Sequence, residues 1–172
     1  MTPQIRPPRP DELAVLREIE RRAGMLFIDV GLADVAAHEP DATDVLAGYV
    51  NDGRAWVITE GSGPVGYAIV DIVDGAAHLE QLSVHPDRGR RGLGGQLLDH
   101  VCRWASAQKF PAVTLTTFAT VPWNAPFYAK HGFRVMTDAE IGPELRALRA
   151  HEAATGLDPA QRVCMRRDTK TV

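Results

Sequence analysis

The segment from Val84 to Leu98 joins the end of a predicted strand to an amphipathic helix through a loop of glycines and arginines. Closely spaced glycines let a backbone approach a ligand, and the first N–H groups of a helix have no acceptor within that helix. Arg88, Arg90 and Arg91 add positive charge to the loop. The pattern predicts a site for the phosphates of a small molecule.

Spacing excludes two common nucleotide loops at this position. In a P-loop a Lys-Ser/Thr pair follows the second glycine, whereas Gly95 and Gln96 follow Gly94 here. A dinucleotide-binding loop requires a third glycine where this chain has Leu97. A glycine-rich turn with solvated arginines remains as the alternative to a phosphate site.

Length and composition favour one domain spanning residues 1–172, since 172 residues with 45% hydrophobic content can bury a sizeable core. A net charge of −3 gives no general attraction to nucleic acid. No apolar run reaches the roughly 18 residues of a membrane span, and no leader segment is recognisable. We expect a cytoplasmic protein without a metal site, in which Cys102 and Cys164 are buried as small apolar residues.

Hydrophobic periodicity and turn residues predict an α/β fold whose sheet has mixed direction. A first helix is expected from a cap at Asp11 to Gly24, and Asp74-Gly75 is typical of a hairpin turn. The strand at 112–118 follows a helix and is therefore expected to be parallel to the strand before that helix. The other strands are expected at 4–6, 54–60, 65–73, 76–84, 133–136 and 162–167, and the other helices at about 93–110, 126–131 and 143–154.

Two motifs resemble those of GCN5-related N-acetyltransferases (GNAT). Val84-His-Pro followed by Arg-Arg-Gly-Leu-Gly is similar to the acetyl-coenzyme A (acetyl-CoA) loop of that family, Gln/Arg-x-x-Gly-x-Gly/Ala. The segment from Asn124 to Phe133 resembles its second signature, an asparagine followed by Phe-Tyr-x-Lys-x-Gly-Phe. The order and separation fit, and the likeness covers about residues 4–136, leaving 137–172 as a C-terminal extension. The opening Gln/Arg position of the loop motif is Gly89 here, so the roles of the individual arginines stay open.

The resemblance implies a central mixed, mainly antiparallel twisted sheet flanked by helices. Acetyl-CoA, as co-substrate, is expected at the splay between the fourth and fifth strands. Backbone groups of the fourth strand hold the pantetheine arm in the family and polarise the thioester carbonyl. Asn124 is expected to cap a short helix and to bond the cofactor arm. The expected cofactor-binding residues are Leu82, Ser83, Val84, Gly89, Arg90, Arg91, Gly92, Leu93, Gly94, Gly95, Asn124 and Phe127.

Acetyl transfer to an amine requires a base, because an amine of pKa near 10.4 is almost fully protonated at pH 7. The resemblance implies Glu80 as that base, acting directly or through water, and Tyr128 as the acid that protonates the departing thiolate. An outward-facing strand glutamate and an aromatic ring packed on Phe127 and Phe133 are the alternatives. Glu20 could reach the acceptor pocket, which its region flanks in the family, but is expected to face solvent.

The segment between Ala23 and Gly53 contains no lysine or arginine and matches a variable wall of the acceptor site in the family. An acidic wall would attract a cationic amine, whether a small molecule or a peptide. The alternative is a solvated polar face that docks through the apolar run 25–28. The acidic residues are Asp29, Asp34, Glu39, Asp41, Asp44 and Asp52.

The leading hypothesis is therefore an acetyl-CoA-dependent N-acetyltransferase that uses direct attack of the amine in a ternary complex. A non-catalytic acetyl-CoA binding or sensing module, and transfer of another acyl group, are the alternatives. Three roles are left open for the tail after about Glu140: closure over the acceptor, a homodimer surface, or cover for the sheet edge.

Overall fold

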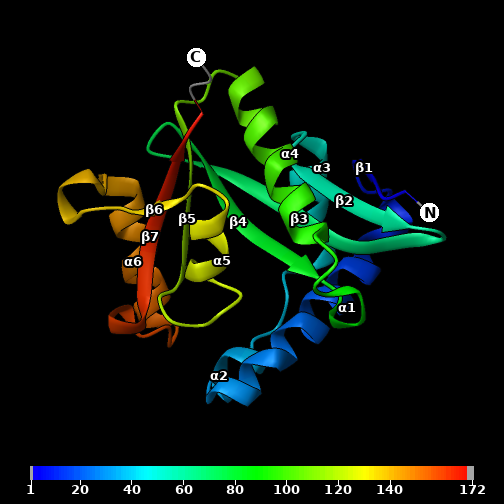
Figure 1. Cartoon of the computed structure of the whole chain (residues 1–172), viewed down its shortest axis with the longest axis horizontal. Coiled ribbons are helices and arrows are strands. Elements are labelled where there is room, and N and C mark those ends of the chain that lie inside the picture. Colours follow the sequence, from blue (N-terminus) through cyan, green and yellow to red (C-terminus); the bar gives the residue numbers. More distant parts are fainter. Residues whose placement is uncertain (1, 170–172) are drawn as a thin grey trace. The chain divides into compact units, whose positions relative to one another are not determined.

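The computed structural model describes residues 2–169, and within them seven strands form one sheet in the order β1-β2-β3-β4-β5-β7-β6 (Figure 1). All the predicted strands are present, although β3 starts earlier than expected and β6 is shorter. The strands are β1 (Gln4–Arg6), β2 (Ala55–Glu60), β3 (Gly63–Val73), β4 (Ala76–Val84), β5 (Ala112–Phe118), β6 (Arg134–Val135) and β7 (Arg162–Asp168).

Helices flank this sheet, which confirms the predicted mixed α/β class. No helix within residues 2–169 has both the length and the apolar character needed to cross a membrane. The α-helices are α1 (Leu13–Gly24), α2 (Ala33–Ala36), α3 (Thr43–Asn51), α4 (Leu93–Ala107), α5 (Ala125–Lys130) and α6 (Pro143–Ala154).

Backbone contacts group the chain into two compact units. The first unit runs from the N-terminal end to Val70 and from Glu80 to Val101. In its core α1 and α3 bury apolar side chains against β2 and β3, a cluster of Leu13, Leu16, Ile19, Leu46, Ala55, Val57, Tyr67 and Ile69. The apolar stripe of the first predicted helix therefore faces this core, as its helical spacing indicates.

The start of α1 differs from the prediction, because Asp11 does not cap it. A 3-10 helix, η1 (Pro10–Glu12), comes first, and Asp11 lies exposed inside it. The buried carboxylate of Glu12 instead accepts hydrogen bonds from both Arg6 Nη atoms, at 2.9 and 2.7 Å, and from the Arg9 backbone N–H at 2.8 Å. The hydrogen bonds from Arg6, followed by that from the Arg9 backbone, lower the pKa of Glu12 to about 2.

We predict that Glu12→Gln destabilises the protein at pH 7 by about 2 kcal/mol, less than a fully buried pair because Arg6 keeps solvent contact. The pKa of Glu12 is lower in the folded chain than its ordinary value of 4.5. The contribution is therefore complete above about pH 4.5 and is lost as the pH falls toward 2. Urea unfolding at pH 7 and pH 3 should show the difference between wild type and variant shrinking at pH 3. An equal difference at both pH values would contradict the assignment.

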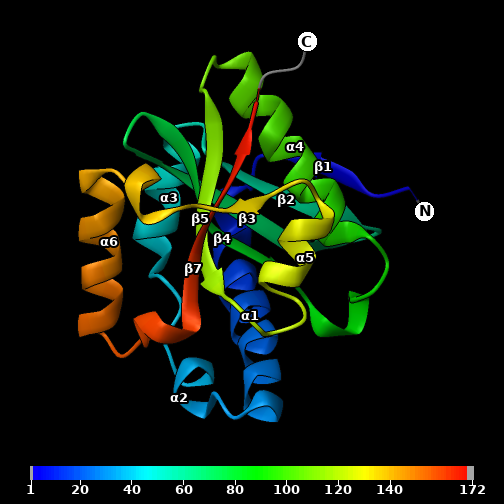
Figure 2. The same ribbon diagram turned by 60° about the vertical axis from the view of Figure 1, so that its left-hand side comes forward.

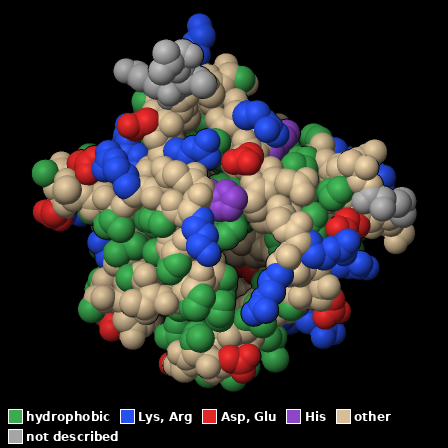
Figure 3. All heavy atoms as spheres, in the orientation of Figure 1, with side chains coloured by type: hydrophobic (Ala, Val, Ile, Leu, Met, Phe, Trp, Pro, Cys, Tyr) green, Lys and Arg blue, Asp and Glu red, His purple; other side chains and the backbone are tan. Residues whose placement is uncertain are grey.

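The apolar run after α1, whose docking was the alternative to an acidic acceptor wall, is largely exposed. It forms a 3-10 helix, η2 (Met25–Val30), in which Met25 is 52% exposed and Ile28 is 48% exposed. Hydrophobic side chains accordingly gather at the bottom of Figure 3, around the position of α2 in Figure 1. Apolar packing therefore does not explain the position of this segment.

The second unit comprises Asp71–Leu79 and the chain from Cys102 onward. In it β4 pairs with β5 in parallel through Ala77–Val113 and His78–Thr114, as predicted. Strand β7 lies between β5 and β6 and pairs antiparallel with both. Residues after 136 therefore supply an interior strand of the sheet, and a core ending near residue 136 would lack it.

Helix α6 lies beside β7 in both ribbon views (Figures 1 and 2). It buries Leu145 in an apolar cluster with Val73, Met136 and Cys164. Cys164 and Cys102 are both buried, as predicted. The last residues of the described chain are thus held by packing as well as by strand pairing.

Candidate functional site

The glycine-arginine loop follows β4 directly and lies in the first unit. Gly92 has φ +77° and Arg90 has φ +60°, so the backbone turns sharply just before α4. A helical hydrogen bond runs from Gln96 N to Gly92 O at 3.1 Å. The N–H groups of the first helical turn precede this bond and have no acceptor in their own helix. These N–H groups, at Leu93, Gly94 and Gly95, suit an anion.

An acidic residue that the sequence did not single out holds two of the loop arginines. Glu60, the last residue of β2, pairs with Arg91 at 2.8 Å and with Arg88 at 3.6 Å. The Glu60 carboxylate is nearly buried, whereas both arginines are about half exposed. The loop is therefore anchored by one carboxylate that partly neutralises its cations. A glutamate at the end of a strand gives no signal of this pairing.

The end of β4 lies close against β3 at Gly66. A Cβ at Gly66 would come within 2.9 Å of the Ser83 carbonyl oxygen and 3.2 Å of a Val84 methyl group. The His85 N–H donates to Val65 O at 2.8 Å, which ties the start of the loop to the same strand. Glycine at position 66 thus permits the close approach that fixes the backbone of Ser83 and Val84.

Carboxylates surround a buried tyrosine in the first unit. The Tyr67 hydroxyl donates to the Glu20 carboxylate at 3.0 Å, so the expectation that Glu20 faces solvent is wrong. Burial raises the pKa of Glu20 above its ordinary value. Burial, and then the negative charges of Glu20, Asp41 and Glu80, raise the pKa of Tyr67. Glu80 is exposed on β4 and contributes to the same negative field. Two carboxylates, Glu80 and Glu20, are thus candidates for proton abstraction.

In the second unit, Asn124 precedes α5 but does not cap it with its side chain. Its Oδ1 accepts instead from the backbone N–H of Phe118, at 3.4 Å, at the end of β5. Its backbone carbonyl accepts from Tyr128 N at 3.0 Å. The predicted side-chain cap is therefore wrong, because the amide reaches back to the strand that precedes it.

Tyr128, one turn into α5, packs on both aromatic neighbours that the sequence indicated. Its ring centroid lies 5.2 Å from that of Phe127 and 5.8 Å from that of Phe133, both edge to face. Burial raises the pKa of Tyr128, and the charge of Arg162 opposes that rise. The phenol is consequently protonated at neutral pH, as a proton donor must be.

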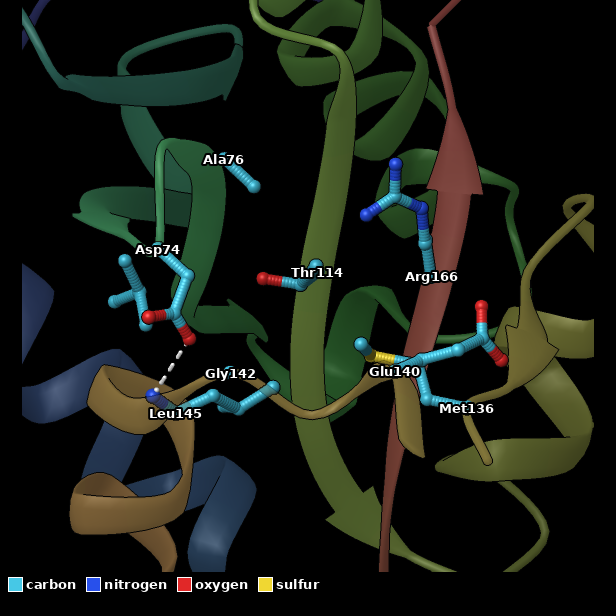
Figure 4. Close-up of a pocket in the computed structure, with 9 residues that line it drawn as sticks. Asp74, Ala76, Thr114, Met136, Glu140, Gly142, Leu145 and Arg166 are labelled. Atoms are coloured by element: carbon cyan, nitrogen blue, oxygen red, sulfur yellow. Dashed lines mark hydrogen bonds between the residues drawn. The ribbon is translucent and has the colours of Figure 1, made fainter. Parts of the chain in front are cut away.

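A surface pocket of about 250 Å³ in the second unit contains none of the predicted site residues (Figure 4). Its wall includes Asp74, whose carboxylate accepts the N–H groups of Glu144 and Leu145, both at 2.9 Å, at the start of α6. It also includes Thr114, whose hydroxyl bonds the buried His78 ring at 2.9 Å. Burial lowers the pKa of His78 to about 4, so this histidine is neutral. The remaining lining residues are Val73, Ala76, Met136, Glu140, Gly142 and Arg166.

Comparison with known proteins supports a family assignment. The model of the acetyltransferase (GNAT) domain matches residues 51–135, which include the loop and the Asn124–Phe133 motif. The ribosomal-protein-S18-alanine N-acetyltransferase of Escherichia coli is 18% identical with a TM-score of 0.68, over 99% of this chain and 96% of that chain. The PaiA N-acetyltransferase of Thermoplasma acidophilum, solved with coenzyme A, is 16% identical with a TM-score of 0.68, over 98% and 99%. Ard1 of Thermoplasma volcanium is 16% identical with a TM-score of 0.70, over 99% and 100%. At these identities the structural likenesses show the fold.

Proposed function

The chain belongs to the GNAT superfamily of acetyltransferases, and on that premise we propose that it moves an acetyl group from acetyl-CoA to a primary amine. The observation that carries the proposal is the loop that turns at Gly92 into the start of α4, within the matched domain. Acetyl-CoA is the co-substrate of this superfamily, and the PaiA structure contains coenzyme A. A non-catalytic acetyl-CoA sensing module would need this glycine-arginine loop but neither a catalytic base nor a catalytic acid.

We assign the pyrophosphate of acetyl-CoA to the loop residues Gly89–Gly95. The N–H groups at the start of α4 suit its negative charge, and the half-exposed arginines add attraction. The backbone of Leu82, Ser83 and Val84 is assigned to the pantetheine arm and the thioester carbonyl, since Gly66 fixes that backbone. Asn124 and Phe127 are assigned to the cofactor through the motif that they share with the family.

The reaction proposed is direct attack in a ternary complex. Glu80 accepts a proton from the ammonium form of the acceptor, directly or through water. The amine nitrogen then attacks the thioester carbonyl carbon, the bond from carbon to sulfur breaks, and the nitrogen releases a second proton to solvent as the amide forms. Tyr128 gives its phenol proton to the departing thiolate and regains one from solvent. The raised pKa of Tyr128 keeps that proton in place before the reaction.

We propose a cationic acceptor from the charge of the first unit. Glu39 pairs with Arg17 and Arg21, and Asp52 pairs with Arg54. These two carboxylates therefore contribute less to the attraction of a cationic acceptor. The exposed acids Asp29, Asp34, Asp41 and Asp44, together with Glu20 and Glu80, contribute the rest of that attraction. The exposed apolar side chains of η2 would suit an acceptor with an apolar part.

We predict that thiol release from acetyl-CoA is faster with polyamines, aminoglycosides or peptides with a free amino terminus than with neutral or acidic amino acids. The measurement is a thiol assay over an amine panel at 0.1 M and 0.5 M salt, because screening should weaken the preference for cations. Preference for acidic amines would contradict the cationic acceptor. Binding of acetyl-CoA without thiol release for any amine would favour the sensing module. The same assay with propionyl-CoA in place of acetyl-CoA tests whether another acyl group is transferred.

A further inference from the structure

The pocket drawn in Figure 4 lies wholly within the second unit, between three strands of the sheet and the start of α6. Ala76 of β4, Thr114 of β5 and Arg166 of β7 form its floor. Thr114 and Arg166 are register partners, so their side chains stand on the same face of the sheet. A volume of about 250 Å³ is slightly below that of sites for drug-sized ligands, so the pocket suits a smaller molecule.

One part of this pocket is apolar. Val73, Met136 and Leu145 line it and belong to one buried apolar cluster, which we call the apolar wall. An apolar group of a ligand that reaches the apolar wall leaves water, which favours binding. The pocket therefore suits a molecule with a small apolar part.

Arg166 supplies hydrogen-bond donors to the pocket. Its Nε donates to the Asp168 carboxylate at 2.8 Å, and its side chain is 28% exposed. Within residues 2–169, neither Nη atom of Arg166 has a hydrogen-bond partner. In Figure 4 the guanidinium stands beside β5 with a terminal nitrogen turned toward that strand. Both Nη groups are thus available to a carboxylate, whose two oxygens match the planar guanidinium.

Two carboxylates also line the pocket, and the protein fixes the position of each. Both Asp74 oxygens accept N–H groups from the first turn of α6, at 2.9 Å. The Glu140 oxygens accept from the two Arg134 Nη atoms at 2.9 and 2.8 Å. In Figure 4, Asp74 and Arg166 lie on opposite sides of Thr114. The pocket therefore presents a carboxylate on one side and a guanidinium on the other.

This arrangement of charges favours a zwitterion over a simple ion. A simple anion at Arg166 would meet the negative field of Asp74 and Glu140, and a simple cation would meet the guanidinium. A zwitterion has a group of opposite charge for each side. Each carboxylate oxygen has two lone pairs, so Asp74 can accept from an ammonium group and keep its hydrogen bonds to α6.

We propose that this pocket binds a free α-amino acid with a small apolar side chain. Its carboxylate binds the Arg166 Nη groups, its ammonium group binds Asp74, and its side chain packs on the apolar wall. The inference goes beyond the proposed function, because none of the described residues that line the pocket is assigned to acetyl transfer. Thr114 lies in the first half of β5, whereas Asn124 binds the other end of that strand at Phe118.

The first test locates the ligand by NMR of labelled methionine methyl groups, with leucine as the probe and no acetyl-CoA present. Met136 is in the apolar wall, whereas Met25 is in η2 of the first unit, within the acidic segment 23–53. We expect the Met136 signal to shift and to saturate at low millimolar leucine while the Met25 signal stays. A shift of Met25 without a shift of Met136 would place leucine at the acceptor wall and overturn the inference. The absence of any shift would overturn it as well.

The second test asks whether both charges of the ligand are recognised. Isocaproate is leucine without its ammonium group, and isoamylamine is leucine without its carboxylate. By calorimetric titration we expect each analogue to bind at least about tenfold more weakly than leucine. Equal affinity for isocaproate would exclude the contact with Asp74, and equal affinity for isoamylamine would exclude the contact with Arg166. Either result would overturn the assignment of a zwitterion.

The third test changes the protein. We expect Arg166→Gln to weaken leucine binding by about tenfold, and Arg166→Lys, which keeps the charge but loses the planar fork, to weaken it less. Asp168 is 57% exposed, so losing its pair with Arg166 should change Tm little. Arg146→Gln is the matched control, because Arg146 pairs with Asp138 at 3.2 Å outside the pocket, and leucine affinity should stay within about twofold.

The outcomes separate this inference from the proposed function. Unchanged leucine binding in Arg166→Gln, with a native Tm, would overturn the inference and leave the acetyltransferase intact. Failure of every amine in the thiol assay, with leucine still shifting the Met136 signal, would overturn the function and support this site.

Discussion

Replacing Glu80 with glutamine is expected to lower kcat for amine acetylation by about 10²-fold to 10³-fold, the usual range for loss of a general base. Glutamine has nearly the same shape and still accepts hydrogen bonds, but it cannot take up a proton at neutral pH. Because the acceptor enters as an ammonium ion, the variant should regain activity as the pH rises toward the pKa of the amine. The measurement is kcat from pH 6 to pH 10 by thiol release, with the KM for acetyl-CoA expected to stay within about threefold.

The matched control is Glu20→Gln, because Glu20 is a second carboxylate beside Tyr67. If Glu80 is the base, Glu20→Gln should alter mainly the KM for a cationic amine. Burial raises the pKa of Glu20, so this carboxylate would itself be a stronger base than an ordinary glutamate. A large loss of kcat with Glu20→Gln and a loss below about tenfold with Glu80→Gln would transfer the role of base to Glu20.

Replacing Tyr128 with phenylalanine is expected to lower kcat by about 10²-fold. The substitution removes one oxygen atom and keeps the ring that packs edge to face on Phe127 and Phe133. If Tyr128 has only a structural role, the substitution should therefore change kcat little. If Tyr128 is the proton donor, the substitution removes the proton that the thiolate needs. Steady-state kinetics with acetyl-CoA and the best amine should show a loss in kcat, and thermal unfolding should show a small change in Tm.

The leaving thiolate provides a further check on Tyr128. Without the phenol proton, thiolate departure should limit the rate, and the dependence of kcat on acceptor basicity should weaken. A kcat for Tyr128→Phe within about threefold of wild type would exclude the tyrosine as the acid. Protonation of the thiolate by water would then explain its departure.

Local patterns predicted most of the secondary structure. The Asp74-Gly75 turn, with φ +49° and +73°, is a backbone conformation that these residue types adopt readily. Strand β5 and helix α6 have the predicted bounds, since proline or glycine breaks the pattern beside each of them. The parallel pairing of β4 with β5 followed from the helix between them.

Two of the incorrect predictions share a physical cause, since in both cases a contact outside the helix replaced the expected capping bond. Asp11 looked like a cap, but the carboxylate of the next residue, Glu12, is drawn into the interior by Arg6. Asn124 has the residue type of a cap, but its side chain binds the end of β5. The apolar run in η2 looked like a docking segment and is exposed.

The sequence by itself determined the elements that depend on near neighbours: the hairpins, the helical stripes and the glycine loop that turns into α4. Only the tertiary structure decided which charges meet. Arg91 finds Glu60 across 31 residues, Glu20 finds Tyr67 across 47, and Arg162 finds Thr116 across 46. The tertiary structure likewise decided that strand β7 lies between β5 and β6. Residue spacing specifies a helix face or a strand edge, whereas pairing between distant residues depends on how those faces pack.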